Sequence, residues 1–179
     1  MLRSAPSPCP FTGRPLRQRG VYALEWAIIF PVFFVLLYAI VCYGLTFLVR
    51  ESMQHAVEEG ARAAMRYPVG KDASTWNDRK LQALTVVKDS LDWLPPALRP
   101  TDARIQFTVC LVSNAGCTHD SPMDANLPCD AQAPCLVVVS YAIHGYQDNA
   151  IAPHIPGLGL ILPSTLTATA SILVDQALL

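Results

Sequence analysis

The fold of this chain is decided by residues 17–49, RQRGVYALEWAIIFPVFFVLLYAIVCYGLTFLV. Within this segment, 24 consecutive residues from Trp26 to Val49 carry no charged side chain, and the run ends at Arg50. At about 1.5 Å per helical residue the run covers roughly 36 Å, compared with about 30 Å for the hydrocarbon core of a bilayer. We therefore expect a transmembrane helix, tilted in the bilayer, over residues 21–49.

Charge is distributed unevenly on the two sides of this segment. The formal net charge of the chain is -1, but residues 1–20 carry four arginines and no acid, whereas residues 51–179 carry 8 basic and 13 acidic side chains. Arginines before a span favour a cytoplasmic N-terminus, which places the body of the protein outside the cytoplasm. The body has no basic stripe, so nucleic acid is not an expected partner.

The helix is expected to continue beyond Arg50. Small and apolar side chains repeat there at spacings of three and four, charged side chains fall between them, and Pro68 and Gly70 end the pattern. This predicts one helix of about 45 residues whose second half offers an apolar stripe to a soluble domain. The stripe consists of Met53, Ala56, Val57, Gly60, Ala61, Ala64 and Met65.

A second helix is expected over residues 75–94. Ser74 or Thr75 can cap its start, and Pro95 with Pro96 stops its end. Its apolar positions recur at helical spacing and predict one buried face. They are Leu81, Leu84, Val87, Leu91 and Leu94.

Three strands are expected in the rest of the chain. Residues 104–112 and 165–175 alternate between apolar and polar side chains, and residues 135–144 are rich in β-branched side chains. A loop at 113–134 and an irregular connection at 145–163 join them. The order of helices and strands predicts an α+β domain with a small three-stranded antiparallel sheet packed on the continuation of the membrane helix.

Four of the six cysteines fall in one window: Cys110, Cys117, Cys129 and Cys135. An even number in an exported domain indicates two disulfides. The alternatives are free buried thiols and a metal site, but gaps of 7, 12 and 6 positions lack the close pairs of a zinc site. If the flanking strands pair across the loop, Cys110–Cys135 with Cys117–Cys129 is the simplest of three connectivities, and the other two remain open.

Catalytic motifs are missing from the sequence. It contains no G-x-S-x-G elbow, P-loop, dinucleotide fingerprint or H-E-x-x-H. The four histidines are isolated from one another. We therefore expect a protein that is not an enzyme and that uses no cofactor and no metal.

The residues around Gly20 resemble the processing site of type IV prepilins and pseudopilins. Two arginines precede GVYALEW at residues 20–26, and the apolar run follows. The resemblance is strongest to TadE-like minor pseudopilins of the tight-adherence (Flp) pilus system, and three stretches carry it. They are RGVYALEWAIIFPVFFVLLYAIVCYG, then RESMQHAVEEGARAAMRY, and the terminal LTATASILVD.

This resemblance implies a division of the chain and a role for four residues. Residues 1–20 would be a cytoplasmic leader, residues 21–49 the membrane helix, and residues 50–179 a periplasmic, pilin-like domain. A prepilin peptidase would cut between Gly20 and Val21, and Glu25 with Trp26 would form the assembly contact. The implied partners are the peptidase, other minor pseudopilins, the major pilin, the inner-membrane assembly platform and the membrane itself.

Glu25 has a physical reason to matter in such an assembly. An ionisable group at the edge of a membrane helix costs on the order of 2 kcal/mol or more. Cleavage after Gly20 would create an α-amine on Val21, with a pKa near 8, and Glu25 of a neighbouring subunit could pair with it. Two opposite charges about 4 Å apart attract by about 4 kcal/mol at an effective dielectric of 20. The alternative is a carboxylate that only reaches the lipid headgroups.

A second class of function remains open from the sequence. The chain could be an uncleaved, signal-anchored periplasmic binding or sensory domain whose helix is only a tether. The pseudopilin hypothesis predicts a mature chain of 159 residues that begins at Val21, and the tether hypothesis predicts the full chain.

Overall fold

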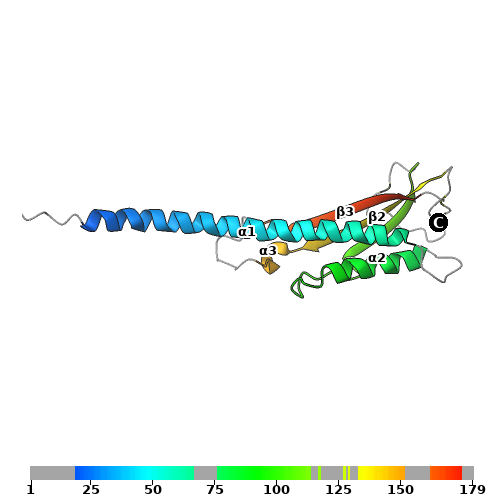
Figure 1. The fold of residues 1–179 in the computed structure, drawn as a ribbon, viewed down its shortest axis with the longest axis horizontal. Helices are drawn as coiled ribbons and strands as arrows, with labels where there is room; N and C mark the ends of the chain where they lie inside the picture. Colours follow the sequence, from blue (N-terminus) through cyan, green and yellow to red (C-terminus); the bar gives the residue numbers. More distant parts are fainter. Residues whose placement is uncertain are drawn as a thin grey trace, which may run out of the picture. The chain divides into compact units, whose positions relative to one another are not determined.

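The computed structural model describes residues 19–66, 76–113, 117, 127, 129, 133–151 and 162–174. The predicted leader up to residue 18, the predicted cap at Ser74 or Thr75 and most of the predicted 113–134 loop lie outside these residues. The elements follow the order α1 (Arg19–Met65), α2 (Trp76–Ser90), β1 (Ile105–Leu111), β2 (Cys135–His144), α3 (Tyr146–Asn149) and β3 (Thr165–Val174) (Figure 1). The α+β class and the expected order of the five main elements are confirmed.

The N-terminal helix α1 is 47 residues long and continues through Pro31. The chain divides into two compact units, Met1–Ala39 and Ile40–Leu179, and α1 contributes to both. The second unit contains α2, α3 and the whole sheet. The second unit begins at Ile40 because it is defined by contacts between residues. The predicted boundary at residue 50 instead marks the end of the apolar run, and it stays a prediction.

The sheet has the strand order β1-β2-β3, and both pairs are antiparallel. Phe107 of β1 lies opposite Val139 of β2, and Val139 lies opposite Ala170 of β3. Residues opposite one another in neighbouring strands share a face of the sheet, and these three side chains are buried. The alternation predicted for β1 and β3 therefore does mark the face that joins the hydrophobic core.

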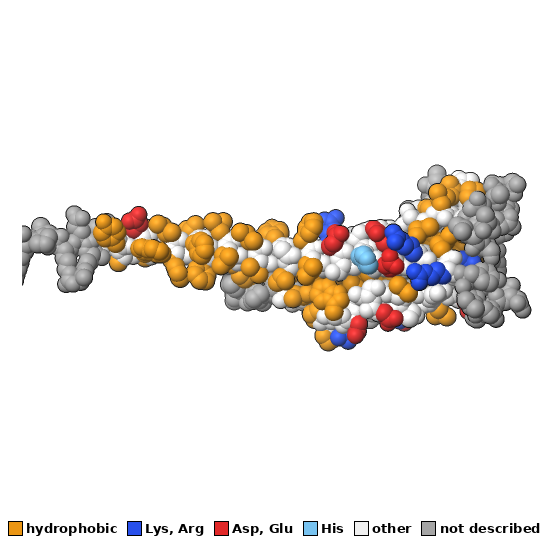
Figure 2. All heavy atoms as spheres, viewed as in Figure 1, with side chains coloured by type: hydrophobic (Ala, Val, Ile, Leu, Met, Phe, Trp, Pro, Cys, Tyr) orange, Lys and Arg blue, Asp and Glu red, His pale blue; other side chains and the backbone are white. Residues whose placement is uncertain are grey.

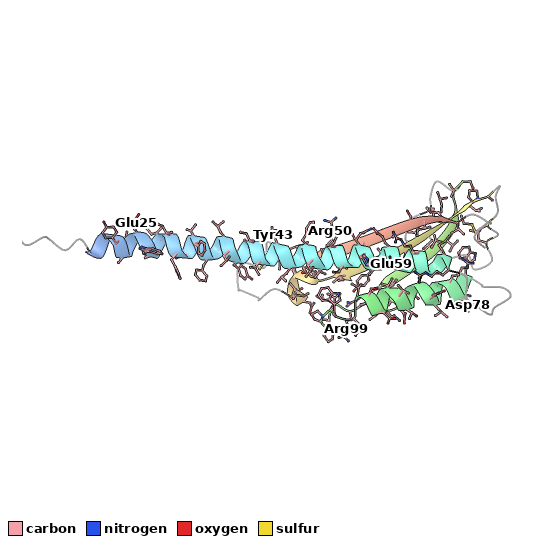
Figure 3. The ribbon with its side chains drawn as sticks, in the orientation of Figure 1. Glu25, Tyr43, Arg50, Glu59, Asp78 and Arg99 are labelled. Carbon is pink, nitrogen blue, oxygen red and sulfur yellow. A yellow bond between two sulfur atoms is a disulfide. The ribbon has the colours of Figure 1, made fainter. Side chains whose placement is uncertain are left out.

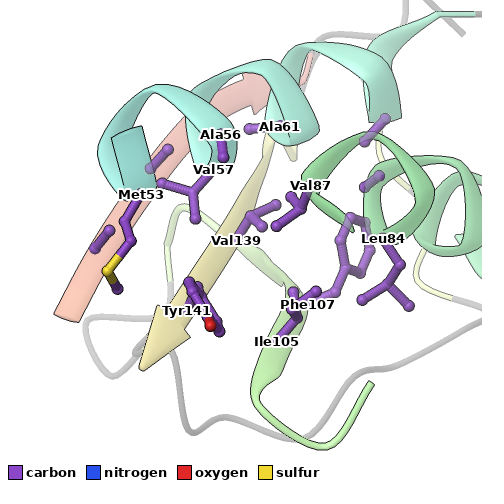
Figure 4. Close-up of a cluster of buried hydrophobic side chains, with 14 of the residues drawn as sticks. Met53, Ala56, Val57, Ala61, Leu84, Val87, Ile105, Phe107, Val139 and Tyr141 are labelled. Atoms are coloured by element: carbon purple, nitrogen blue, oxygen red, sulfur yellow. The ribbon is translucent and has the colours of Figure 1, made fainter. Parts of the chain in front are cut away.

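The second half of α1 and the helix α2 supply the other side of this core (Figure 4). The predicted stripe of α1 is buried from Met53 to Ala64. At Gly60 the two helices approach so closely that a Cβ atom placed there would lie 2.5 Å from Cγ2 of Val87 and 3.2 Å from the carbonyl oxygen of Ala83. The close packing of α2 on α1 therefore requires a glycine at position 60.

Helix α2 begins at Trp76 and ends at Ser90, four residues before the predicted end. Its predicted face is largely confirmed, but Leu81 is exposed. Buried Trp76, Arg79 and Ala83 show the reason, because the contact face of α2 is centred away from Leu81 around the helix. Leu91 and Leu94, which follow the helix in turns, are fully covered.

The short helix α3 lies in the connection that we expected to be irregular. Gly145 makes the turn out of β2 with a φ of 69°, a left-handed conformation that suits glycine. The next residue, Tyr146, is fully buried, and its hydroxyl donates to Oγ1 of Thr46 over 3.4 Å. Thr46 in turn donates to the carbonyl oxygen of Cys42 over 2.9 Å. Helix α3 thus fixes the β2 end of the sheet to α1 within the second unit.

The four clustered cysteines form two disulfides, but the nested pairing is wrong. Cys110 bonds Cys117, and Cys129 bonds Cys135. The register explains the difference, because Cys110 lies opposite Leu136 while Cys135 lies opposite Leu111. Successive side chains of a strand point to opposite faces, so this offset of one residue places Cys110 and Cys135 on different faces of the sheet. Each cysteine at a strand end instead pairs with its local partner in the loop.

The buried hydroxyl of Tyr141 is expected to contribute to the stability of this domain. Its side chain is fully buried, and its hydroxyl donates to the carbonyl oxygen of Leu98 over 2.6 Å. Burial raises the pKa of Tyr141 above its usual value near 10, and nearby Arg104 opposes part of this rise. The neutral phenol therefore stabilises the fold fully below pH 10, and this stabilisation is lost as the pH rises above that value.

Tyr141→Phe is therefore expected to lower the free energy of unfolding by about 1 kcal/mol at pH 7 and to make its alkaline decrease shallower. Denaturant unfolding at pH 7 and pH 10.5, followed by tryptophan fluorescence, measures both effects. Tyr22→Phe, at an exposed tyrosine, is the matched control and should change neither. An alkaline decrease that is identical in Tyr141→Phe and the unmodified chain would contradict the prediction.

Candidate functional site

The four residues predicted for processing and assembly lie together in the first two turns of α1. Gly20, Val21, Glu25 and Trp26 are all helical. A Cβ atom added at Gly20 would meet no other atom within 4 Å, so the glycine is not explained by packing. This differs from Gly60, where contact with α2 requires the absence of a side chain.

Apolar side chains cover most of the surface of α1 along its uncharged run, residues 26–49, and charged side chains follow it (Figure 2). The side chain of Trp26 is 67% exposed, and the large apolar side chains from Ile28 to Leu37 are all exposed as well. Phe30 and Phe34 contact each other, with ring centroids 4.6 Å apart, but neither is covered. A continuous apolar surface of this kind is typical of a segment that contacts lipid or other apolar helices.

This part of α1 is long and apolar enough to cross a bilayer. The helical segment from Tyr22 to Met65 includes a window of mean hydropathy 2.5, of which 6% is buried within the protein. A core helix of a water-soluble protein would have most of such a window buried. The low burial agrees with a helix that meets lipid directly.

Glu25 is the one acidic side chain in this apolar part of α1 (Figure 3). Its side chain is exposed, and it forms no hydrogen bond or ion pair with any other side chain that the structure describes in residues 19–66. The carboxylate therefore has no internal structural role among these residues. Its exposed position leaves it available for contacts outside these residues.

The second unit contains a groove that the sequence did not predict. It has a volume of about 560 Å³ and lies between the C-terminal end of the apolar run and the start of β3. Tyr43, Phe47 and Arg50 share one side of α1 because they are spaced by four and three residues. The lining is Tyr43, Thr46, Phe47, Arg50, Leu162, Pro163, Thr165, Leu166 and Thr167.

Arg79 is a buried charge that the sequence analysis also missed. It is 1% exposed, and its guanidinium donates to the carbonyl oxygen of Ala64 over 3.1 Å and lies 5.4 Å from the ring centre of Trp76. Ala64 is in the last turn of α1, where carbonyl oxygens lack helical partners and a cation is favourable. We interpret Arg79 as a cap for α1 and not as part of a binding site.

The described residues contain no group of three histidine, cysteine, aspartate or glutamate side chains that could hold a metal ion. His144 is exposed at the end of β2, and His55 is exposed on α1, while the two other histidines lie outside the described residues. The four clustered cysteines are used in disulfides. The residues that stand out for function are therefore those of the first turns of α1 and of the groove.

Comparison with known families agrees with this emphasis on α1. The family model described as TadE-like protein matches residues 20–62, about a quarter of the chain. No curated protein and no solved structure matches the chain. The matched family implies a protein associated with a tight-adherence pilus. The resemblance predicted from the sequence is therefore confirmed, and the chain is TadE-like over residues 20–62, the part of α1 that carries Gly20, Glu25 and Trp26.

Proposed function

We propose that this chain is a minor pseudopilin that acts in the assembly of a tight-adherence (Flp) type IV pilus or a related secretion apparatus. The observation that carries the proposal is the TadE-like match, which begins at Gly20 and ends at Arg62 within α1. It therefore includes the predicted cleavage site, the acid that follows it and the apolar helix. The proposed role is structural, since α1 presents an apolar surface for contact with other apolar helices.

The proposed location is the bacterial inner membrane. Residues 21–49 cross it once, the arginines of residues 1–20 stay in the cytoplasm, and residues 50–179 form the periplasmic domain. The two disulfides support this orientation, because disulfides form and persist in the periplasm but not in the cytoplasm. Exposed apolar side chains along α1 support insertion in lipid.

Processing after Gly20 gives Glu25 a partner. The new α-amine of Val21 would carry a positive charge at the membrane edge, where the carboxylate of Glu25 on a neighbouring subunit attracts it. Trp26 is exposed beside Glu25 and would pack on the same neighbour. The proposed partners are a prepilin peptidase, other minor pseudopilins, the major pilin and the inner-membrane assembly platform.

Cleavage is tested by the intact mass of the protein extracted from membranes of cells that contain an active prepilin peptidase. The expected chain has 159 residues and begins at Val21. Recovery of the full 179-residue chain from such cells would contradict the proposal and favour an uncleaved, signal-anchored binding or sensory domain.

A pair of glycine variants makes this measurement specific. Gly20→Leu is expected to accumulate as the full chain, and Gly44→Leu is expected to be cleaved normally. Both glycines are helical and have open space where a side chain would be added, so neither substitution disturbs packing within the protein. Equal processing of the two variants would show that cleavage does not depend on Gly20.

A further inference from the structure

The groove beside Arg50 is built from two chemically different parts. Its apolar part consists of Tyr43 and Phe47 on α1 and Leu162 with Pro163 on the segment before β3. Tyr43 and Phe47 are 52% and 68% exposed. Its polar part consists of the guanidinium of Arg50 and the hydroxyls of Thr165 and Thr167.

The position of the groove along α1 indicates its surroundings. The uncharged run ends at Val49, so Arg50 lies within one helical turn of the end of the predicted span. The headgroup region adds about 5–8 Å on each side of the hydrocarbon core, roughly the length of one turn. Tyr43 and Phe47 therefore lie at the depth of the outer acyl chains, and Arg50 lies at the depth of the phosphates.

Near Arg50, one side of α1 packs against the rest of the second unit. Cys42, Thr46 and Val49 are buried against the rest of the second unit, whereas Tyr43, Phe47 and Arg50 lie next to them and open into the groove. Arg50 forms no ion pair or hydrogen bond with any residue in the described part of the chain. Its charge at this depth is thus available to an anion from outside the protein.

We propose that this groove binds one anionic phospholipid of the outer leaflet, with the phosphate on Arg50 and an acyl chain along Tyr43 and Phe47. Arginine matches phosphate oxygens with two parallel N–H donors, and the threonine hydroxyls can donate to the remaining oxygens. A volume of about 560 Å³ lies within the range of about 300–1,000 Å³ found for ligand clefts. The proposal depends on insertion of α1 in the membrane but not on cleavage or pilus assembly.

Native mass spectrometry of the full chain in detergent tests this proposal. The probes are phosphatidylglycerol and phosphatidylcholine with identical acyl chains. We expect phosphatidylglycerol to be retained with at least about tenfold higher apparent affinity, because the second lipid carries no net charge. Arg50→Gln is expected to remove this preference, and Phe47→Ser is expected to weaken retention of both lipids.

The matched control is Arg62→Gln, which removes the same charge from an exposed arginine on the same helix that does not line this groove. It should keep the preference for phosphatidylglycerol. Equal retention of the two lipids by the unmodified chain, or an equal loss in Arg62→Gln, would overturn the proposal. Displacement of phosphatidylglycerol by an equal concentration of glycerol 1-phosphate would also overturn it, because the site would then bind a soluble phosphate and not a lipid.

Discussion

Glu25→Gln is expected to reduce incorporation of this protein into pilus assemblies by at least about tenfold while leaving cleavage after Gly20 intact. The substitution keeps the size of the side chain and removes its charge. A pair of opposite charges about 4 Å apart attracts by about 4 kcal/mol at an effective dielectric of 20, and each 1.4 kcal/mol corresponds to a factor of ten. Loss of even a third of this attraction gives the expected effect.

The substitution is not expected to disturb the fold, because Glu25 is exposed and forms no contact that the fold of the described residues requires. A change in assembly would therefore not reflect unfolding of the domain. Intact mass checks the cleavage, and the amount of the protein in sheared pili and in crosslinked membrane complexes measures the assembly. Glu51→Gln, which neutralises an exposed acid outside the apolar run of α1, is the matched control.

The two explanations of Glu25 give opposite results in this experiment. If the carboxylate pairs with the α-amine of Val21 on a neighbour, Glu25→Gln fails in assembly and Glu51→Gln succeeds. If the carboxylate only reaches the lipid headgroups, a neutral glutamine is at least as favourable at the membrane edge and assembly is normal. Normal assembly of Glu25→Gln would therefore exclude the pairing role.

Most of the fold follows from local sequence patterns. The bounds of β2 agree with the predicted residues 135–144, and the core face of β3 alternates as expected because a period of two is a direct consequence of strand geometry. The long helix α1 was predictable because an uncharged run and a stripe with helical spacing follow each other without a break. These features depend on neighbours in sequence.

The features that were not predicted depend on contacts between distant residues. The disulfide pairing depends on a register in which Cys135 lies opposite Leu111, so that Cys110 and Cys135 lie on different faces of the sheet. Helix α3 depends on the contact of Tyr146 with Thr46, which are 100 positions apart. No pattern in residues 145–163 indicates that contact.

The two candidate sites also differ in whether they depend on neighbours in sequence or on contacts between distant residues. Gly20, Glu25 and Trp26 could be proposed as a site from the sequence because they form one short motif at the start of a helix, and their role stays a prediction. The groove could not be proposed in this way, because Leu162 and Thr165 reach Arg50 only after the sheet has formed. The spacing of Tyr43, Phe47 and Arg50 was a usable signal, since it places two aromatic side chains and a cation on one side of a helix.

Gly60→Leu is expected to lower the free energy of unfolding of the domain by more than about 3 kcal/mol, because a large side chain has no space between α1 and α2. Even the first atom of a side chain would lie 2.5 Å from Cγ2 of Val87. Valine is stiff at χ1, Val87 is fully buried, and the second close atom is the backbone oxygen of Ala83. The clash can therefore be relieved only if α2 moves away from α1.

Gly60→Ala compares the cost of this clash with the low helix propensity of glycine, which alanine would improve. In an open helical position, glycine to alanine stabilises by about 1 kcal/mol, whereas overpacking of a core costs about 1–3 kcal/mol. At Gly60 the two effects oppose each other, and we expect a net loss of about 1 kcal/mol because the contact involves backbone. At Gly44, where no atom lies within 4 Å of the added Cβ, the same substitution should not destabilise.

Thermal unfolding of the three variants, followed by near-ultraviolet circular dichroism, measures these differences. A change of 1 kcal/mol corresponds to a shift in Tm of about 2–4 °C for a protein of this size. A lower Tm for Gly60→Ala together with no loss of Tm for Gly44→Ala is the decisive result, because the two substitutions are chemically identical and lie on the same helix. If Gly60→Ala does not lower Tm, α2 does not pack against α1 as closely as the distances at Gly60 indicate. If Gly60→Ala alone destabilises, close contact with α2 holds the second half of α1 in place.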